Sequence, residues 1–453
     1  MTGLLIGLGV TAIVVWLIIK NYQPHTVLLL AGLFLLATTA VLMPDASILH
    51  GKGSSIGWVG LDVFGYVKWS LSSTTAELGM IIMAAGGFSK YMDKIGATDA
   101  MVAVCIRPLK LLKAPYVVLA LGCAAGQVFH IFIPSAAGQA MLLVVTFFPT
   151  LVRLGVSPAA AAAMIGTTAV LDLGPASGGT NLAAEIAGLD VTVYFTDYQI
   201  PAAAIATVVI SVLTYVTARY YDRRAGHAVM LDRAEGATAI KCPAIYALLP
   251  MAPLTLILGF TMLAPQKIHL DVVTAMLISA FSALGCEMIR GQDAKAALKR
   301  FMAFFEGMGT MFTQVVSLII CAETFANGLQ TIGAVGFLTG AAQGSGFGVV
   351  AMTLVMCAIV ILTAIVTGSG NAAFFAFGKL APKIAGNYGV PAVSMLLQMQ
   401  LCASLGRSLS PVAAIIIAVS EVGQCSPMEI VRRTAIPVVG GLLAVLLYGA
   451  ANI

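Results

Sequence analysis

The stretch TGSGNAAFF, Thr367 to Phe375, interrupts the chain directly after the apolar run GFGVVAMTLVMCAIVILTAIV, residues 346–366. That run is long enough to cross a bilayer, because a membrane-spanning helix needs about 20 predominantly apolar residues. Glycine permits a tight chain reversal, and Ser, Thr and Asn supply neutral hydrogen-bonding groups where a full charge would be costly. We therefore predict that residues 347–387 form a helical hairpin that enters the membrane and returns to the same side.

The composition places the rest of the chain in a membrane as well. Apolar residues make up 60% of the 453 residues and charged residues only 9%, which is more apolar than a soluble core requires. Long apolar windows recur at 3–20, 26–43, 73–92, 115–133, 158–189, 199–218, 244–264, 270–289, 306–327, 347–366, 391–420 and 435–450. We predict an all-α, multi-pass protein embedded in the lipid bilayer.

The basic residues indicate how the chain is oriented. We treat 347–387 and the corresponding segment 115–153 as re-entrant hairpins, which leaves about ten full crossings. Eighteen of the 24 lysines and arginines then lie on one side and five on the other, while Arg407 remains inside the membrane. Cytoplasmic loops carry the excess of Lys and Arg, so both termini are predicted to be periplasmic. The net charge of +5 therefore reflects membrane topology, and no nucleic-acid partner is predicted.

An internal repeat relates the two halves of the chain at an offset of 234 to 237 residues. The aligned segments are FSKYMDKIGA (88–97) with FANGLQTIGA (325–334), PSAAGQA (134–140) with GSGNAA (368–373), and LGPASG (173–178) with LSPVAA (409–414). Each half contributes an odd number of crossings, so the second half is predicted to be inverted. The predicted organisation is a first repeat over 1–217, a charged cytoplasmic linker over 218–243 and a second repeat over 244–453.

Each repeat also contains an apolar segment that is interrupted by glycine and proline. The first, 158–189, breaks around Gly174, and the second, 391–422, breaks before Pro411. Helix ends inside hydrocarbon leave N–H and C=O groups unpaired unless a ligand, water or protein group satisfies them. Inverted repeats with paired breaks are typical of secondary transporters, whose substrate binds near the bilayer midplane.

The two hairpin tips are candidate binding segments. Their polar and small residues are Ser135 and Gly138 in the first tip and Thr367, Gly368, Ser369, Gly370 and Asn371 in the second. The alternative is that these residues only pack helices together, as small residues often do in membranes. Two tips at equivalent positions of the repeat favour ligand binding.

Two ionisable residues, Asp172 and Arg407, lie within the breaks, and such residues inside a membrane are functional candidates. Arg407 can hold a carboxylate through two hydrogen bonds and stays charged at every relevant pH. Alternatively, Asp172 and Arg407 neutralise each other, or their pair opens as substrate arrives. His130 is expected to be a hydrogen-bonded packing histidine, while Glu185 and Glu421 are minor candidates for a proton site.

The motifs of several other protein classes are missing from the sequence. It contains no HExxH, GxSxG, Walker loop or dense Cys/His cluster, so we predict neither an enzyme nor an ATP-driven pump, and no metal or organic cofactor. The eight cysteines are scattered and form no CxxC pair, which argues against a disulfide framework.

Two segments, TGSGNAAFFAF (367–377) and LGRSLSPVAAIIIAVSEVGQCSPMEIVRRTAIPV (405–438), resemble the DcuC family of anaerobic four-carbon dicarboxylate carriers. The resemblance implies an inner-membrane exchanger or proton-coupled carrier of fumarate, succinate or malate, assembled as a homodimer. It also implies an elevator mechanism, in which a domain holding both hairpins and both broken helices moves against a scaffold of the remaining crossings. The site residues that it implies are those of the two tips together with Gly174, Ser177, Arg407, Ser408 and Ser410.

The resemblance leaves the substrate and the coupling ion open. Relatives of this architecture carry citrate, gluconate or other organic anions, and an anion channel is a further alternative, because hairpins with glycine tips also build pores. Sodium-coupled relatives have Ser-Asn-Thr tips in both halves, whereas the first tip here reads SAAGQ, residues 135–139. Either H⁺ or Na⁺ is therefore a candidate coupling ion.

Overall fold

The computed structural model describes residues 2–20, 22–43, 48–49, 55–106, 108–109, 112, 114–226, 243–263, 270–291, 293–334 and 348–452. The regular elements in these ranges are helices, and no strand occurs among them. Seven helical stretches are long and apolar enough to cross a membrane, namely Pro24–Leu42, Pro115–Phe132, Val191–Arg224, Val272–Arg290, Ala294–Thr331, Val349–Thr367 and Pro427–Ala451. The prediction of an all-α, multi-pass fold is confirmed for this part of the chain.

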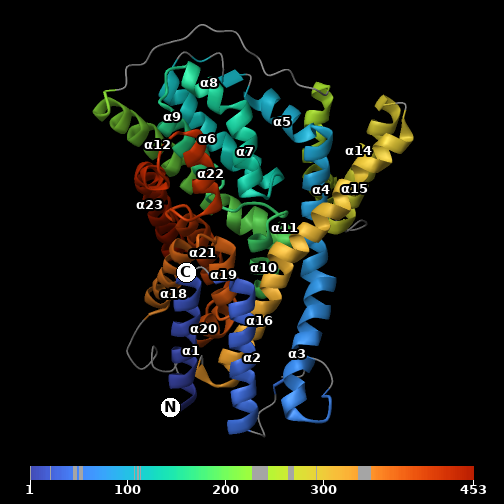
Figure 1. The fold of residues 1–453 in the computed structure, drawn as a ribbon, viewed down its shortest axis with the longest axis vertical. Coiled ribbons are helices and arrows are strands. Elements are labelled where there is room, and N and C mark those ends of the chain that lie inside the picture. The colour runs from blue at the N-terminus through green and yellow to red at the C-terminus, as the bar shows by residue number, and fades with distance from the viewer. Residues whose placement is uncertain are drawn as a thin grey trace.

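Two helices of unusual length form one side of the molecule (Figure 1). The first consists of α3 (Val59–Thr74), the π-helical segment η1 (Thr75–Gly79) and α4 (Met80–Ile95); the second consists of α15 (Ala294–Met311), η5 (Phe312–Val316) and α16 (Ser317–Thr331). Each is about 55 Å long at about 1.5 Å per residue, well beyond the ~30 Å hydrocarbon core. The predicted crossing at 73–92 is therefore the later part of a helix that begins at Val59.

Small residues allow these two long helices to pack closely. α4 packs along α15, and α16 packs against α2 (Pro24–Leu42). A β-carbon on Gly307 would lie only 2.6 Å from the carbonyl oxygen of Gly86. Glycine is thus required for the backbones of α4 and α15 to approach each other at this point, as in other membrane helix pairs.

The remaining helices of the first half follow the chain in order. They are α1 (Thr2–Ile19), α5 (Ala97–Ile106), α6 (Pro115–Phe132), α7 (Ala136–Thr146), α8 (Phe148–Arg153), α9 (Pro158–Gly166), α10 (Gly178–Ala187), α11 (Val191–Val193), η3 (Tyr194–Gln199) and α12 (Ile200–Arg224). α12 continues through 218–224, the first residues of the predicted linker, whereas 227–242 lie outside the described residues.

The second half contains a comparable series. Besides the long helix, it comprises η4 (Ala244–Met251), α13 (Ala252–Leu263), α14 (Val272–Gly291), α18 (Val349–Thr367), α19 (Gly370–Gly378), α20 (Ala381–Asn387), α21 (Ala392–Arg407), α22 (Ala414–Val422) and α23 (Pro427–Ala451). The predicted second hairpin, 347–387, contains α18, α19 and α20, and its first residue, 347, lies outside the described residues.

Local sequence signals explain where the short helices begin. The hydroxyl oxygens of Ser135, Ser177 and Ser369 accept backbone N–H groups in the first turns of α7, α10 and α19. A side-chain oxygen at this position satisfies a donor that has no partner within the helix. Both tips and the first break therefore end where a serine starts the next helix, whereas α22, after the second break, begins after Ala413 without a side-chain cap.

The hairpins and broken helices pack on one another across the two halves. α7 packs against α22, and α19 packs against α10 and α21. Figure 1 shows α22 among α6, α7 and α9 toward one end of the molecule, and α10 beside α19 nearer its middle. The two tips and the two breaks are thereby held within one helical assembly.

Candidate functional site

The first hairpin tip lies between α6 and α7. The hydroxyl oxygen of Ser135 accepts the backbone N–H of Gly138 at 3.1 Å, and both residues are exposed. The next residue, Gln139, is fully buried, and its Nε2 donates to the carbonyl oxygens of Gly126 at 2.7 Å and Thr168 at 3.2 Å. Gln139 thus links the tip by hydrogen bonds to α6, the first helix of this hairpin, and to the first break.

The second tip is a compact turn between α18 and α19. The backbone N–H of Ser369 donates to Thr367 Oγ1 at 3.1 Å, and Thr367 Oγ1 donates to the carbonyl oxygen of Ser369 at 3.2 Å. Ser369 Oγ accepts the N–H of Ala372 at 3.2 Å. As an acceptor in this bond, the Ser369 hydroxyl keeps its own proton available for a ligand. Thr367, Ser369 and Asn371 are all partly exposed.

The glycines of the second tip are needed for close packing. A β-carbon on Gly368, whose φ is 68°, would lie 3.0 Å from the backbone nitrogen of Ala413, and one on Gly370 would lie 2.9 Å from the carbonyl oxygen of Ala403. The backbone of this tip therefore packs directly on α21 and on the second break. Contact of these two glycines with substrate stays a prediction.

The first break separates α9 from α10 and carries Asp172. Asp172 has a φ of 48°, a left-handed conformation that is uncommon for residues other than glycine and that is often found at functional sites. A β-carbon on Gly179 would lie 2.6 Å from Asp172 Oδ2. The carboxylate therefore lies against the first turn of α10, where the partial positive charge of a helix N-terminus stabilises it. Ser177 and Gly174 of the same break are buried.

The second break separates α21 from α22 and carries Arg407 at the end of α21. Arg407 Nη2 donates to the carbonyl oxygen of Ala169 in the first break at 2.6 Å. Three buried polar atoms around it, Arg407 Nε, Ser408 Oγ and Ser404 Oγ, have no hydrogen-bond partner among the described residues. Buried polar groups are rarely left unpaired, so these atoms are candidates for hydrogen bonds to a polar ligand. Ser410 is buried, and its Oγ accepts the N–H of Val412 at 3.4 Å.

Asp172 and Arg407 do not form an ion pair in this conformation. Among the described residues, the ionisable side chain within 4.0 Å of Asp172 is His130, whose Nε2 lies 3.5 Å from Asp172 Oδ1. His130 Nδ1 lies 2.9 Å from Gln139 Oε1. His130 is hydrogen-bonded and buried, as predicted, but its second nitrogen faces a carboxylate, which the sequence pattern did not indicate.

A buried polar network that the sequence reasoning missed connects the two halves. Gln400 on α21 accepts a hydrogen bond from the hydroxyl of Tyr194 at 2.7 Å and donates to Thr180 Oγ1 and to the carbonyl oxygen of Asp172, both at 3.2 Å. Gln199 Nε2 donates to Gln400 Oε1 at 3.3 Å. The available signal was the presence of amide side chains inside apolar segments, where each must find a partner.

Four helix N-termini meet the tips and breaks. α7 and α19 start at the tips, and α10 and α22 start at the breaks. Each helix N-terminus carries a partial positive charge and unpaired N–H groups, which favour anions. Together with the Arg407 guanidinium, this arrangement suits a ligand with negatively charged oxygens.

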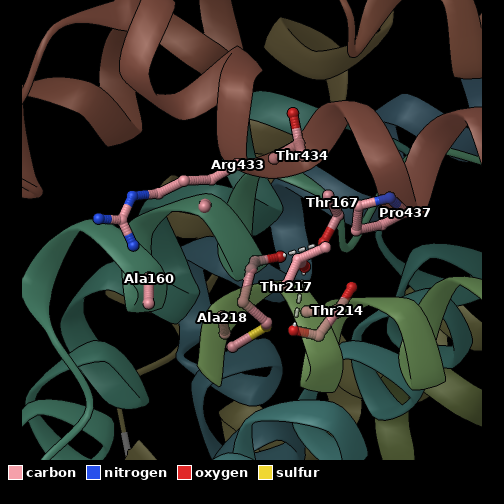
Figure 2. Close-up of a pocket in the computed structure, with 10 residues that line it drawn as sticks. Ala160, Thr167, Thr214, Thr217, Ala218, Arg433, Thr434 and Pro437 are labelled. Atoms are coloured by element: carbon pink, nitrogen blue, oxygen red, sulfur yellow. Dashed lines mark hydrogen bonds between the residues drawn. The ribbon is translucent and has the colours of Figure 1, made fainter. Parts of the chain in front are cut away.

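Two cavities lie near the site. One of about 300 Å³ is bounded by α10, α11, η1 and the start of α14, and it reaches Asn181, whose Oδ1 has no partner among the described residues. The other, of about 10 Å³, has room for about one water molecule and lies between α9, α12 and α23. Figure 2 shows Thr167 of the first break on one side of it and Arg433 on another.

Glu185 and Glu421, the minor candidates for a proton site, lie outside the buried residues of the two breaks. Glu185 and Glu421 are both exposed, near the far ends of α10 and α22. Within the described ranges, no group of three or more His, Cys, Asp and Glu side chains could hold a metal ion, and the cysteines described are free thiols.

The fold and this site define a class: a polytopic membrane transporter in which tips and helix breaks converge. The family model of DcuC, C4-dicarboxylate anaerobic carrier, matches residues 2–452, and the chain belongs to this family. It is therefore a transporter of the C4-dicarboxylate carrier family and not an enzyme.

Named relatives align over nearly the whole chain. The chain is 35% identical over 449 residues to the probable anaerobic C4-dicarboxylate transporter DcuC of Vibrio cholerae, covering 99% of this chain and 97% of that relative. It is 33% identical over 445 residues to the anaerobic C4-dicarboxylate transporter DcuC of Escherichia coli, covering 98% and 95%. The crystal structure of the Alcanivorax borkumensis YdaH transporter has a similar fold, with a TM-score of 0.63 at 17% identity over 95% of this chain and 98% of that one.

Proposed function

We propose that this protein is a secondary carrier that moves fumarate, succinate and malate across the inner membrane, by exchange or together with H⁺ or Na⁺. The proposal depends on the surroundings of Arg407. Its guanidinium donates a hydrogen bond to the carbonyl oxygen of Ala169, while Arg407 Nε and the hydroxyl of Ser408 have no partner among the described residues. One carboxylate of the substrate meets Arg407. The other meets the hydroxyls and N–H groups of the tips, at Ser135, Gly138 and the segment Thr367–Asn371.

An inverted repeat underlies the proposed transport cycle, with about ten crossings and two re-entrant hairpins. Unusual local geometry recurs at equivalent positions of the two halves and supports this repeat. The π-helical segments Thr75–Gly79 and Phe312–Val316 are 237 residues apart. Left-handed glycines at Gly155 and Gly389 precede α9 and α21. The side chains of Asp190 and Ser426, 236 residues apart, cap the last long helix of each half.

An elevator movement follows from this organisation. The mobile domain comprises both hairpins and both broken helices, and the two long helices belong to the scaffold. Lys379, after α19, forms an ion pair with the buried Glu323 of α16, which also accepts hydrogen bonds from Ser70 and Thr74 of α3. This contact would join the mobile domain to the scaffold in the conformation observed, and it would have to open during transport.

On the family resemblance, the carrier forms a homodimer in the lipid bilayer of the inner membrane. On the distribution of Lys and Arg, both termini face the periplasm. Cysteine labelling at either terminus in intact cells tests this orientation, because a periplasmic thiol reacts with an impermeant reagent and a cytoplasmic one does not.

The experiment that tests the function is counterflow in proteoliposomes. Purified protein is reconstituted with internal unlabelled succinate, and uptake of external labelled succinate is followed with and without pH and sodium gradients. We expect rapid uptake of labelled succinate that depends on internal succinate. External fumarate and malate should compete with this uptake. Stronger competition by gluconate or citrate would indicate another organic anion as substrate. Flux without counter-substrate or gradient would indicate a channel.

A further inference from the structure

The protonation of His130 is constrained by the amide that holds it. Gln139 Nε2 donates to two carbonyl oxygens, those of Gly126 and Thr168, and a flipped amide would direct an oxygen at both of them. The Gln139 oxygen therefore faces His130 Nδ1, at 2.9 Å. Because an amide oxygen can only accept, His130 Nδ1 must carry a hydrogen.

This assignment determines what His130 presents to Asp172. A neutral imidazole has one N–H group, so a neutral His130 would direct the bare lone pair of Nε2 at the carboxylate, 3.5 Å from Oδ1. Nε2 has no hydrogen-bond partner among the described residues. The two side chains are only 1% and 13% exposed, so water compensates little for this repulsion. A proton on Nε2 converts it into a charge-assisted contact.

We propose that His130 carries a second proton on Nε2, held against Asp172, and that this proton is the coupling ion of the carrier. The inference rests on the proposed transport function and names its coupling site. The charged and titratable groups that face the pair, within the part of the chain described, are Arg407 on α21 and Tyr194 on η3. Arg407 and the N-terminus of α10 both stabilise the Asp172 carboxylate, which places the proton on His130.

Charge balance links this proton to the substrate. With His130 doubly protonated, the group of His130, Asp172 and Arg407 carries one net positive charge, and a bound dianion leaves one net negative charge. Without the proton, the same dianion would leave two negative charges in a buried site. Proton and dicarboxylate therefore bind cooperatively, and by linkage each raises the affinity of the other.

The protonation of His130 can be measured directly, in the absence of substrate. Purified protein labelled with ¹⁵N-histidine is studied by NMR at neutral pH, and the His130 signals are assigned by their loss in His130→Gln. We expect both ring nitrogens of His130 to be protonated, and the ring to become neutral with hydrogen on Nδ1 in Asp172→Asn. A neutral His130 in the wild type would overturn the inference, even if the protein transports succinate.

A second test measures the coupling. In weakly buffered proteoliposomes, proton uptake is recorded with a pH dye beside labelled succinate uptake. We expect the ratio of protons to succinate to fall by one in His130→Gln and to remain at the wild-type value in His25→Gln, a histidine on α2. An unchanged ratio in His130→Gln would overturn the inference. If the wild type moves no dicarboxylate, the proposed function fails, while the NMR result still decides whether the proton is present.

Discussion

The guanidinium of Arg407 donates a hydrogen bond to the carbonyl oxygen of Ala169, 238 residues earlier in the chain, at a distance of 2.6 Å. The bond joins the two helix breaks, one from each half. It uses one edge of the planar guanidinium, whose five N–H groups form a rigid fork. Arg407 Nε is left without a partner among the described residues, so the side chain is fixed in place while part of it remains free to bind.

Replacing Ser408 by Ala should weaken substrate binding and leave stability unchanged. Ser408 Oγ is buried without a partner in the described structure, so its removal breaks no protein hydrogen bond. A hydrogen bond to a charged ligand contributes about 1.5–3 kcal/mol, which corresponds to a loss of about tenfold or more in succinate affinity. Equilibrium binding of labelled succinate measures it, with Ser420→Ala as control, because the buried Ser420 hydroxyl donates to the carbonyl oxygen of Ile417 in its own helix. Wild-type succinate affinity in Ser408→Ala would show that this hydroxyl does not bind the substrate.

Replacing Gln139 by Leu should destabilise the first hairpin. The buried amide of Gln139 bonds to His130 and to two backbone carbonyls, and a partner left unsatisfied costs about 1–3 kcal/mol. Thermal unfolding in detergent should show a lower midpoint than the wild type. Gln330→Leu is the matched control, since Gln330 is exposed. Equal midpoints for the two variants would show that the amide is dispensable.

Gly368 and Gly389 allow a test of the second tip with matched backbones. Both have a φ of 68°, so alanine carries a similar backbone strain at each. A β-carbon at Gly368 would lie 3.0 Å from Ala413, whereas at Gly389 it would meet no atom within 4 Å. We expect Gly368→Ala to lose more stability and more transport than Gly389→Ala, in thermal unfolding and counterflow assays. If both variants behave alike, close packing of the tip on the second break is not what requires glycine.

Asp222 and Arg433 should be strongly coupled in stability. Their side chains are 0% and 9% exposed and meet at 3.0 Å, and Ser157 donates to the same Asp222 oxygen at 2.6 Å. Removing one partner of a buried ion pair typically costs about 3–5 kcal/mol, whereas replacing both by apolar residues can be neutral. Thermal unfolding of Asp222→Leu, Arg433→Met and the double variant should show the double variant to be more stable than the sum of the single losses predicts. Additive losses would mean that the pair is not coupled.

The sequence predicted the tips and breaks because their signals are local. Glycine, proline and small polar residues act within a few residues, so the helix ends around the two tips and the two breaks could be predicted from the sequence. Repetition of these signals in the second half supported the assignment. The excess length of α3–η1–α4 was not predicted, since Asp62, Lys68 and Ser70 interrupt the apolar pattern of α3 before the window at 73–92.

The chemistry between segments could not be predicted in the same way. His130, Gln139 and Asp172 meet only because α6, α7 and the first break fold against one another, and Gln400 reaches them from the other half of the chain. Such contacts depend on tertiary packing, which no spacing rule in one sequence contains. For the same reason, the packing of Gly368 on Ala413 was not predicted, although the need for glycine at this turn was.

The central claim is that a dicarboxylate binds at Arg407, between the two breaks. A ligand that binds only the folded protein stabilises it by about 2.7 kcal/mol at about 100 times its Kd, so succinate should raise the unfolding midpoint of the purified wild type. The measurement compares this rise in wild type, Arg407→Ala, Arg407→Lys and Arg219→Ala, the last an exposed arginine on α12. We predict a full rise in wild type and Arg219→Ala, a reduced rise in Arg407→Lys and none in Arg407→Ala. A rise in Arg407→Ala equal to that of the wild type would contradict the account.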